Sequence, residues 1–176
     1  LVDPSSYGVD LSSDMIAVAQ AKDTRATFIV GDMLEHTAGD LFDIVLSTQD
    51  ALNYLPPEAH AAFFERLQSY CHGGSLVYLD FDTAHDFEVV WDGQKHVFHA
   101  KTFRLTRQFS YNPESQTGTE VQTWEATNSD RRAVQKEVHR LYPIHPHKFA
   151  EEAVKAGFHL VDFVDPNTGE VEAAPD

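Results

Sequence analysis

The first 83 residues alternate between short apolar segments and helical segments, and this alternation limits the folds that the chain can adopt. The segments 26–30, 41–47 and 75–81 are short and almost continuously apolar, and Tyr7 to Asp10 has the pattern of the end of another strand. Strands without an alternating polar face are typical of a parallel sheet that helices cover on both faces. The sequence therefore predicts an α/β fold built on a parallel sheet.

Helical spacing places helices between these strands. Ser12 or Ser13 can cap the first helix through its side-chain oxygen. Pro57 suits the first turn of a second helix, which the Gly73-Gly74 pair would end. The C-terminal region continues the alternation, with a helix around Phe149 to Val154 that Gly157 stops and a last strand from Phe158 to Val164.

Residues 84–142 follow a different pattern, with turn signals and strand-forming aromatic residues. Asp92-Gly93 is a tight-hairpin signal, and a second hairpin is predicted at Asn112 to Ser115. We therefore expect an antiparallel β insertion within one α/β domain, which residues 1–83 and 143–176 would form. The aromatic residues of the insertion fit two interpretations, a lid over a substrate and the core of a small sheet.

Charge and cysteine content bear on partners and location. The chain has 13 Lys and Arg against 28 Asp and Glu, a formal charge of −15. Such a surface repels nucleic acid, and no apolar run is long enough to span a membrane. The single cysteine, Cys71, cannot form an internal disulfide, and no signal peptide is visible. We expect a cytoplasmic protein that acts on a small molecule and binds neither nucleic acid nor membrane; its oligomeric state stays open.

Three aspartates, Asp10, Asp32 and Asp50, follow successive predicted strands. Ligands bind beyond the carboxyl ends of strands in open α/β sheets. A carboxylate there can accept hydrogen bonds from both hydroxyls of a ribose, and Asp32 could accept one from an adenine amino group. The alternative is that these residues cap strand ends. No metal site is expected, because His145-Pro146-His147 has no cysteine or carboxylate at a recognised ligand spacing.

Five blocks of the sequence together resemble a known family. They are residues 7–16 (YGVDLSSDMI), residues 31–33 (GDM), residues 42–45 (FDIV) followed by 50–55 (DALNYL), residues 73–83 (GGSLVYLDFDT) and residues 149–163. In this order and spacing they resemble the class I S-adenosylmethionine-dependent methyltransferases, in particular the small-molecule type with a β-rich insertion. The resemblance spans nearly the whole chain and implies a Rossmann-like methyltransferase sheet with an antiparallel β insertion.

The resemblance also implies roles for individual residues. The cofactor's ribose would bind Asp10, and the adenine pocket would be formed by Leu11, Met15, Gly31, Asp32 and Met33. Ser47 to Gln49 would border its methionine portion. Asp50, Asn53 and Tyr54 would face the methyl group and the substrate, with Asp50 the first candidate for a catalytic base and Tyr54 the second.

The sequence departs from the family at two places. No G-x-G loop occurs in the 176 residues, so the first strand with its glycine-rich loop is not found, and the last strand is not found either. Both strands are internal in the family's sheet order, so their absence would leave ladder groups unpaired. We therefore expect the sequence to belong to a longer protein; the alternative is a degenerate, inactive relative.

The function implied is methyl transfer from S-adenosylmethionine to an unidentified small molecule. Two alternative functions remain open. Asp10 would serve the ribose of a nicotinamide cofactor equally well, as in a dehydrogenase, although the chain has no Tyr-x-x-x-Lys pair of the short-chain type. The β insertion could also be a protein-binding module without catalytic activity.

Overall fold

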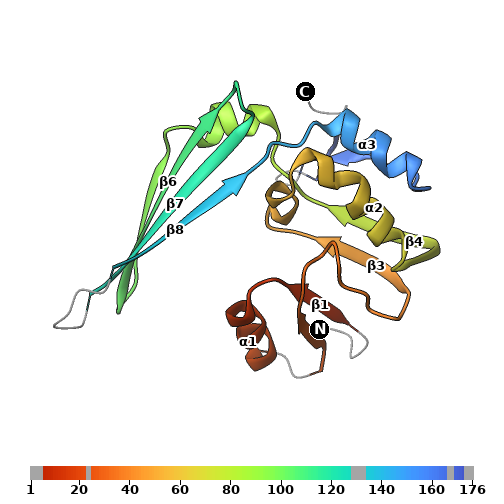
Figure 1. Cartoon of the computed structure of the whole chain (residues 1–176), viewed down its shortest axis with the longest axis horizontal. Coiled ribbons are helices and arrows are strands. Elements are labelled where there is room, and N and C mark those ends of the chain that lie inside the picture. The colour runs from red at the N-terminus through yellow and green to blue at the C-terminus, as the bar shows by residue number, and fades with distance from the viewer. Residues whose placement is uncertain (1–5, 23–24, 128–133, 166–168, 173–176) are drawn as a thin grey trace.

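The computed structural model describes residues 6–22, 25–127, 134–165 and 169–172. Figure 1 shows the elements along the chain. In order they are β1 (Tyr7–Asp10), α1 (Ser13–Lys22), β2 (Thr27–Val30), β3 (Phe42–Ser47), the 3₁₀ turns η1 (Ala51–Tyr54) and η2 (Pro57–Ala59), α2 (His60–Gln68), β4 (Cys71–Leu79), the π-helix η3 (Asp86–Trp91), β5 (Lys95–His99), β6 (Phe103–Asn112), β7 (Thr117–Ala126), β8 (Val134–Leu141), α3 (Pro146–Lys155), β9 (Phe163–Val164) and β10 (Val171–Glu172).

The parallel strands form two separate pairs. β1 pairs with β2 from Tyr7↔Thr27 to Asp10↔Val30, and β3 pairs with β4. In the described part of the chain no ladder joins β1 to β3. The predicted α/β fold with parallel pairing is confirmed. A continuous parallel sheet is not observed among the described residues, where β1-β2 and β3-β4 remain separate.

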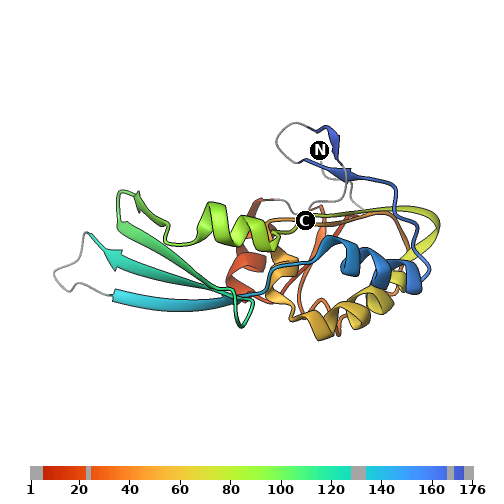
Figure 2. The ribbon, with the colours of Figure 1, turned by 90° about the horizontal axis from the view of Figure 1, so that it is seen from above.

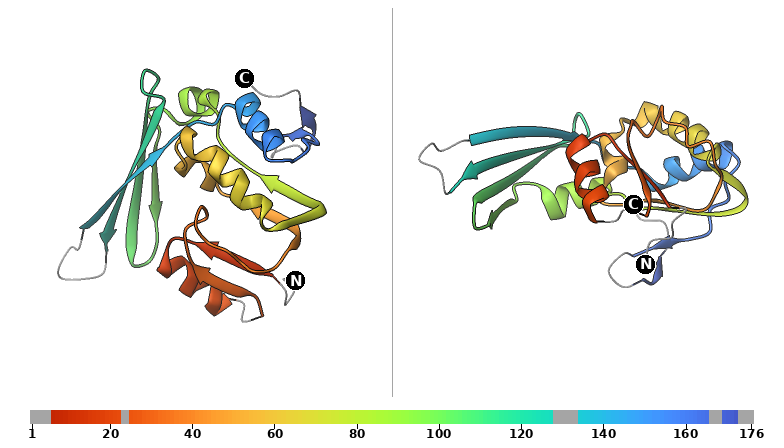
Figure 3. Two further views of the ribbon diagram at one scale, coloured as in Figure 1. Left: turned by 45° about the vertical axis from the view of Figure 1, so that its right-hand side comes forward. Right: turned by 90° about the horizontal axis from the view of Figure 1, so that it is seen from below.

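The first helix and the first three strands lie where the sequence predicts them. Ser12 begins α1: its side-chain Oγ accepts a hydrogen bond from the Met15 amide at 3.3 Å, and its carbonyl accepts one from the Ile16 amide at 3.1 Å. Ile16 is the buried residue of this helix. Figure 3 shows α1 beside β1 and β2.

The second helix ends earlier than predicted. α2 stops at Gln68, and β4 begins at Cys71, so the Gly73-Gly74 pair lies in the strand. There the register between β3 and β4 shifts, and Ser75 Oγ bonds both the His72 amide and the Phe42 carbonyl. The glycines form a bulge, since Gly74 adopts a φ of 105° that side chains rarely tolerate. Cys71 is consequently the first residue of a strand.

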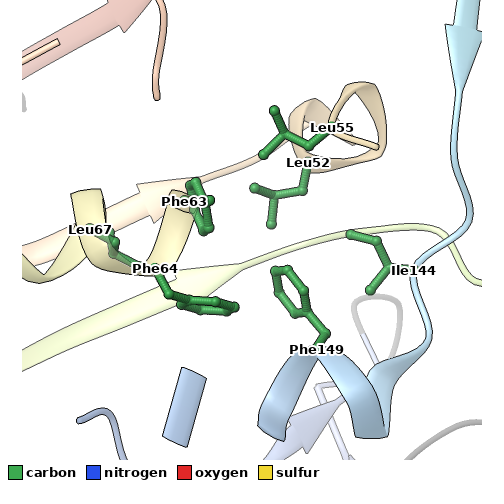
Figure 4. Packing of buried hydrophobic residues seen from close by; sticks show 7 residues of the cluster. All are labelled: Leu52, Leu55, Phe63, Phe64, Leu67, Ile144 and Phe149. Carbon is green, nitrogen blue, oxygen red and sulfur yellow. The ribbon is translucent and has the colours of Figure 1, made fainter. Parts of the chain in front are cut away.

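One face of the β3–β4 pair carries the main core. α2, α3 and η1 pack there, and Figure 4 shows the buried side chains, which are Leu52, Leu55, Phe63, Phe64, Leu67, Ile144 and Phe149. The centroids of the Phe64 and Phe149 rings lie 4.7 Å apart between the two helices. Each such side chain contributes about 1.5–3 kcal/mol by leaving water. The opposite face, with Ile44 and Leu46, is exposed, so the described residues cover the pair on one face, not on both as predicted.

The predicted antiparallel insertion forms a sheet of four strands in the order β5-β6-β7-β8. Figures 1 and 2 show this sheet extending to one side of the α/β part. The turn after Asn112 is a hairpin, as predicted, and Asn112 Oδ1 accepts the amides of Glu114 and Ser115. The Asp92-Gly93 turn, however, joins η3 to β5 and not two strands, because the residues before it form a π-helix.

The C-terminal helix also agrees with the sequence, whereas the last strand is shorter than predicted. α3 spans Pro146–Lys155, and Gly157 follows with a φ of 92°. In place of a strand over 158–164, β9 holds Phe163–Val164 alone and pairs antiparallel with β10. Only the residues that find a ladder partner in the described part are extended as a strand. Within that part, every helix is too short or too polar to cross a bilayer.

Candidate active site

The edge formed by the ends of β1 and β2 carries two of the predicted carboxylates. Asp10 ends β1, and its Oδ1 accepts the Ser12 amide at 2.7 Å. Asp32 follows β2, and its Oδ1 accepts the Leu34 amide at 2.8 Å. The Gly31 amide donates to the Asp10 carbonyl at 3.0 Å and continues the ladder to this edge. Both carboxylates are exposed and lie at the carboxyl ends of neighbouring parallel strands.

Apolar side chains flank this edge. Leu11 and Met15, at the start of α1, are exposed beside Asp10. Met33 differs, because its side chain packs against the main core. An apolar surface next to an exposed carboxylate has the composition that an adenosine would need, since the base is flat and apolar and the ribose carries two hydroxyls.

The end of β3 holds the second group of predicted residues. The Ser47 carbonyl accepts the Asp80 amide at 3.0 Å, so this edge continues across β3 and β4. Gln49 and Asp50 follow in the left-handed region, with φ of 64° and 57°. Asp50 precedes η1, and its carbonyl accepts the Asn53 amide at 3.0 Å. Partial burial, and then the negative charge of Asp80, raise the pKa of the Asp50 carboxyl.

The insertion brings three further polar residues to η1. The Tyr54 hydroxyl lies 3.1 Å from Nδ1 of His139 on β8. Glu120 on β7 faces His139 across the β7–β8 ladder. Glu120 is only 4% exposed and forms an ion pair with Arg107 on β6. Arg107 is also close enough to Asp50 and Tyr54 to affect both pKa values.

The pKa values in this cluster depend on the ion pair between the buried Glu120 carboxylate and Arg107. Burial is the largest single effect and opposes ionisation of Glu120. The hydrogen bond and charge of Arg107, with smaller effects of Gln122 and His139, together outweigh it, and the pKa of Glu120 is lowered. That hydrogen bond likewise raises the pKa of Arg107. Burial and then Glu120 raise the pKa of Tyr54. At neutral pH the cluster therefore holds an ionised Glu120–Arg107 pair beside a protonated tyrosine hydroxyl.

A group of carboxylates lies next to this cluster. Burial, and then the charges of Asp50 and Asp86, raise the pKa of Asp82 to about 7. Asp80 adds to the effect. The charges of Asp80 and Asp86 raise the pKa of both Asp50 and Asp82, which indicates that these carboxylates share one region. A cationic group placed there would relieve the repulsion.

Asn53 has a role different from the one that the resemblance implies. Its side chain is 0% exposed, so it does not face a substrate. Nδ2 donates to the carbonyls of Asp82 at 2.8 Å and Tyr142 at 2.9 Å, and Oδ1 accepts the Asp82 amide at 2.8 Å. Asp82 leads into the insertion and Tyr142 leads out of it. Asn53 therefore fastens both ends of the insertion to η1.

Sequence reasoning assigned Arg107, Glu120 and His139 no role in the site. The three come from different strands, and only the strand register puts them on one face of the sheet. In the residues that the structure describes, no cluster has the three His, Cys, Asp or Glu side chains that a metal ion would need.

Two hollows differ in their relation to these residues. A hollow of about 450 Å³ lies between α2 and α3, and its lining includes Glu58, His60 and Lys148 but none of the residues of either edge. A smaller pocket lies on the insertion, lined in part by Trp91, His96, Arg107 and Glu120. The small pocket adjoins the polar cluster, whereas the larger hollow does not.

Comparisons with known proteins agree with this architecture. Residues 3–74 match the family model described as a methyltransferase domain. No curated protein matches the sequence at a significant level. Among solved structures, an S-adenosylmethionine-dependent methyltransferase from Clostridium acetobutylicum has a TM-score of 0.81 at 13% identity, covering 95% of this chain and 69% of that one. The sugar N-methyltransferase KedS8 from Streptoalloteichus sp. has a TM-score of 0.79 at 18% identity, covering 97% and 69%.

A third similar structure is CalS10, an amino pentose methyltransferase from Micromonospora echinaspora with S-adenosylmethionine bound. Its TM-score is 0.72 at 18% identity, and the match covers 94% of this chain and 71% of that one. The match to each of these structures spans the parallel pairs and the β insertion of this chain. The predicted fold is confirmed: the chain has the fold of the class I S-adenosylmethionine-dependent methyltransferases.

Proposed function

We propose that this protein transfers the methyl group of S-adenosylmethionine to the amino group of a small molecule. The observation that carries the proposal is a polar cluster between η1 and the insertion. Tyr54 contacts His139 of the insertion, and the Arg107–Glu120 ion pair lies close enough for Arg107 to affect the pKa of both Asp50 and Tyr54. The cluster lies beyond the carboxyl end of β3, where ligands of α/β sheets bind. Similar structures described as a sugar N-methyltransferase and an amino pentose methyltransferase support an amine as the acceptor.

The cofactor side of the proposal rests on the two sheet edges. Asp10 would accept hydrogen bonds from the ribose hydroxyls, and Asp32 one from the adenine amino group. Leu11 and Met15 would cover the adenine face. Ser47 and Gln49 would border the methionine portion. When bound, the cofactor supplies an activated methyl group, so the protein's main task is to align the acceptor with it.

The acceptor side would use the acidic region. An amine is protonated near neutral pH and must lose its proton before its lone pair can attack. Carboxylates near Asp50 would attract the cation, and Asp50 is the first candidate to take the proton. Tyr54 is the second; because its hydroxyl is protonated, it would have to pass that proton to His139 as it takes one from the amine. Glu120 and Arg107 would hold this face of the insertion in place.

The cofactor test is a calorimetric titration of the protein with S-adenosylhomocysteine and, separately, with NAD. We expect binding of the first. Asp10→Ala should weaken it at least about fivefold, since a paired contact to a charged group contributes about 1–3 kcal/mol. Asp14→Ala is the matched control, because Asp14 is an exposed acidic residue of the same segment that supports the helix start. Binding of NAD alone would favour the dehydrogenase.

The acceptor test uses methyl-labelled S-adenosylmethionine with pairs of small molecules that carry an amine or a hydroxyl at the same position. Label should enter the amine members only. Transfer to the hydroxyl members at an equal rate would contradict the amine proposal while leaving methyl transfer intact. The cytoplasmic location and the absence of nucleic-acid and membrane partners stay predictions from the charge and the cysteine content.

A further inference from the structure

Two consecutive residues after β3 adopt a backbone conformation that side chains disfavour. Gln49 and Asp50 both have left-handed φ, and neither is glycine. Each such residue costs on the order of 1–2 kcal/mol. The turn redirects the chain from β3 into η1, whose last residue is Tyr54. Contacts outside the turn must therefore hold it.

Asp80, just beyond β4, makes those contacts. Its Oδ2 accepts the Gln49 amide at 3.0 Å, and its Oδ1 accepts the Asp50 amide at 3.0 Å. Its own amide donates to the Ser47 carbonyl at 3.0 Å. Two successive amides that face one carboxylate form an anion-binding nest, and hydrogen bonds to an ionised acceptor are about twice as strong as neutral ones.

Asp80 also acts through its charge. Partial burial, and then Asp80, raise the pKa of Asp50, while Arg107 lowers it and Asp86 raises it. The same carboxylate thus sets both the backbone position of Asp50 and part of the field around it. Replacing Asp80 by asparagine would remove the charge and retain one acceptor oxygen, which separates the two effects.

We infer that Asp80 is a positioning residue, a carboxylate clamp that holds the left-handed Gln49-Asp50 turn and thereby places Asp50 and η1 for the reaction. The inference rests on the proposed function for its consequence in catalysis. The clamp itself is a property of the backbone and can be tested without a substrate.

The direct test is hydrogen exchange of the backbone amides of residues 49 and 50. Asp80→Ala should speed their exchange at least tenfold, with Asp80→Asn in between. Asp43→Ala is the matched control: Asp43 lies on β3, its side chain is 93% exposed, and it bonds His72 instead of the turn. Unchanged exchange in Asp80→Ala, or an equal change in Asp43→Ala, would overturn the clamp.

A rescue experiment separates strain from a general loss of structure. Glycine accepts positive φ without the penalty. Gln49→Gly should therefore restore part of the protection and of the thermal midpoint that Asp80→Ala loses, and should do less in the wild-type background. If the two substitutions were additive, the left-handed turn would not be what Asp80 stabilises.

The functional arm measures S-adenosylhomocysteine affinity and the pH dependence of methyl transfer. Asp80→Ala should weaken the affinity severalfold. Asp80→Asn should shift the pH profile of methyl transfer to lower pH, because Asp50 would ionise more readily without the neighbouring negative charge. A wild-type protein that binds no S-adenosylhomocysteine would count against the proposed function, while the exchange data would still decide the clamp. Normal affinity and an unshifted profile in both variants would show that the clamp does not serve the site.

Discussion

The Tyr54 hydroxyl lies 3.1 Å from Nδ1 of His139, although 85 residues separate them along the chain. Their rings also meet edge to face, with centroids 5.9 Å apart. Tyr54 ends η1, and His139 belongs to the last strand of the insertion. This contact joins the part of the fold assigned to the cofactor with the part assigned to the acceptor.

The first prediction removes that hydrogen bond. Tyr54→Phe keeps the ring and deletes the hydroxyl, so methyl transfer should fall at least about a hundredfold, the lower end of what a positioned proton-transfer group provides. Affinity for S-adenosylhomocysteine should stay unchanged. Tyr78→Phe, an exposed tyrosine on β4, is the control. Independently of turnover, the His139 imidazole resonances should shift in Tyr54→Phe and not in Tyr78→Phe; no shift would contradict the contact.

The second prediction concerns Asn53. Asn53→Ala would leave the Asp82 amide and the Tyr142 carbonyl without their partners, while the Asp82 carbonyl would keep the Ile144 amide. We expect the substitution to lower the free energy of unfolding by about 2–4 kcal/mol. Asn112→Ala is the comparison, since Asn112 caps an exposed turn through two amides and should cost about 1 kcal/mol. Denaturant unfolding measures both. If the two variants lost similar free energies of unfolding, the bonds of Asn53 would stabilise the fold no more than an exposed turn cap does.

A third prediction follows from the pKa of Asp82, which is about 7 against an ordinary value of 3.8. Because the folded pKa is raised, the stabilising contribution of the protonated carboxyl is complete below pH 3.8 and is lost as the pH rises through about 7. Asp82→Asn cannot ionise, so its thermal midpoint relative to wild type should rise between about pH 4 and pH 7 and stay level above that. Each pH unit by which the folded pKa exceeds the unfolded pKa corresponds to about 1.4 kcal/mol. A pH-independent difference would contradict the assignment.

The fourth prediction tests the core of the insertion. A Cβ added at Gly118 would lie 2.8 Å from Phe109 Cζ and 2.9 Å from Phe87 Cε2, and both rings are buried. Gly118→Ala should therefore cost about 1–3 kcal/mol through overpacking. Gly73→Ala meets nothing within 4 Å and should change stability by less than about 0.5 kcal/mol. Equal thermal midpoints for the two variants would show that the rings can move aside.

Local patterns predicted the strand ends well. Asp10, Asp32 and Asp50 follow apolar segments too short for anything but strands, and Ser12 marks the start of α1 because its side-chain oxygen satisfies an orphan amide. The same reasoning failed at Gly73-Gly74. A glycine pair suits both a helix end and a strand bulge, and the choice depends on whether Cys71 finds a ladder partner in Phe42.

The insertion shows most clearly what local sequence patterns cannot predict. Turn signals and aromatic content were enough to predict an antiparallel region, because both act over a few residues. That Arg107, Glu120 and His139 share one face depends on register across three strands, and that this face meets Tyr54 depends on how Asn53 fastens the insertion.

Periodicity, caps and turn residues therefore determined the fold class and the carboxylates at the strand ends, since these depend on neighbours a few positions away. The tertiary structure alone decided which carboxylates interact, where the insertion presents its polar face, and that Asp80 bonds two amides about 30 residues earlier. Such contacts join backbone and side-chain groups from distant segments, and their geometry exists only once the strands have paired and the core has closed.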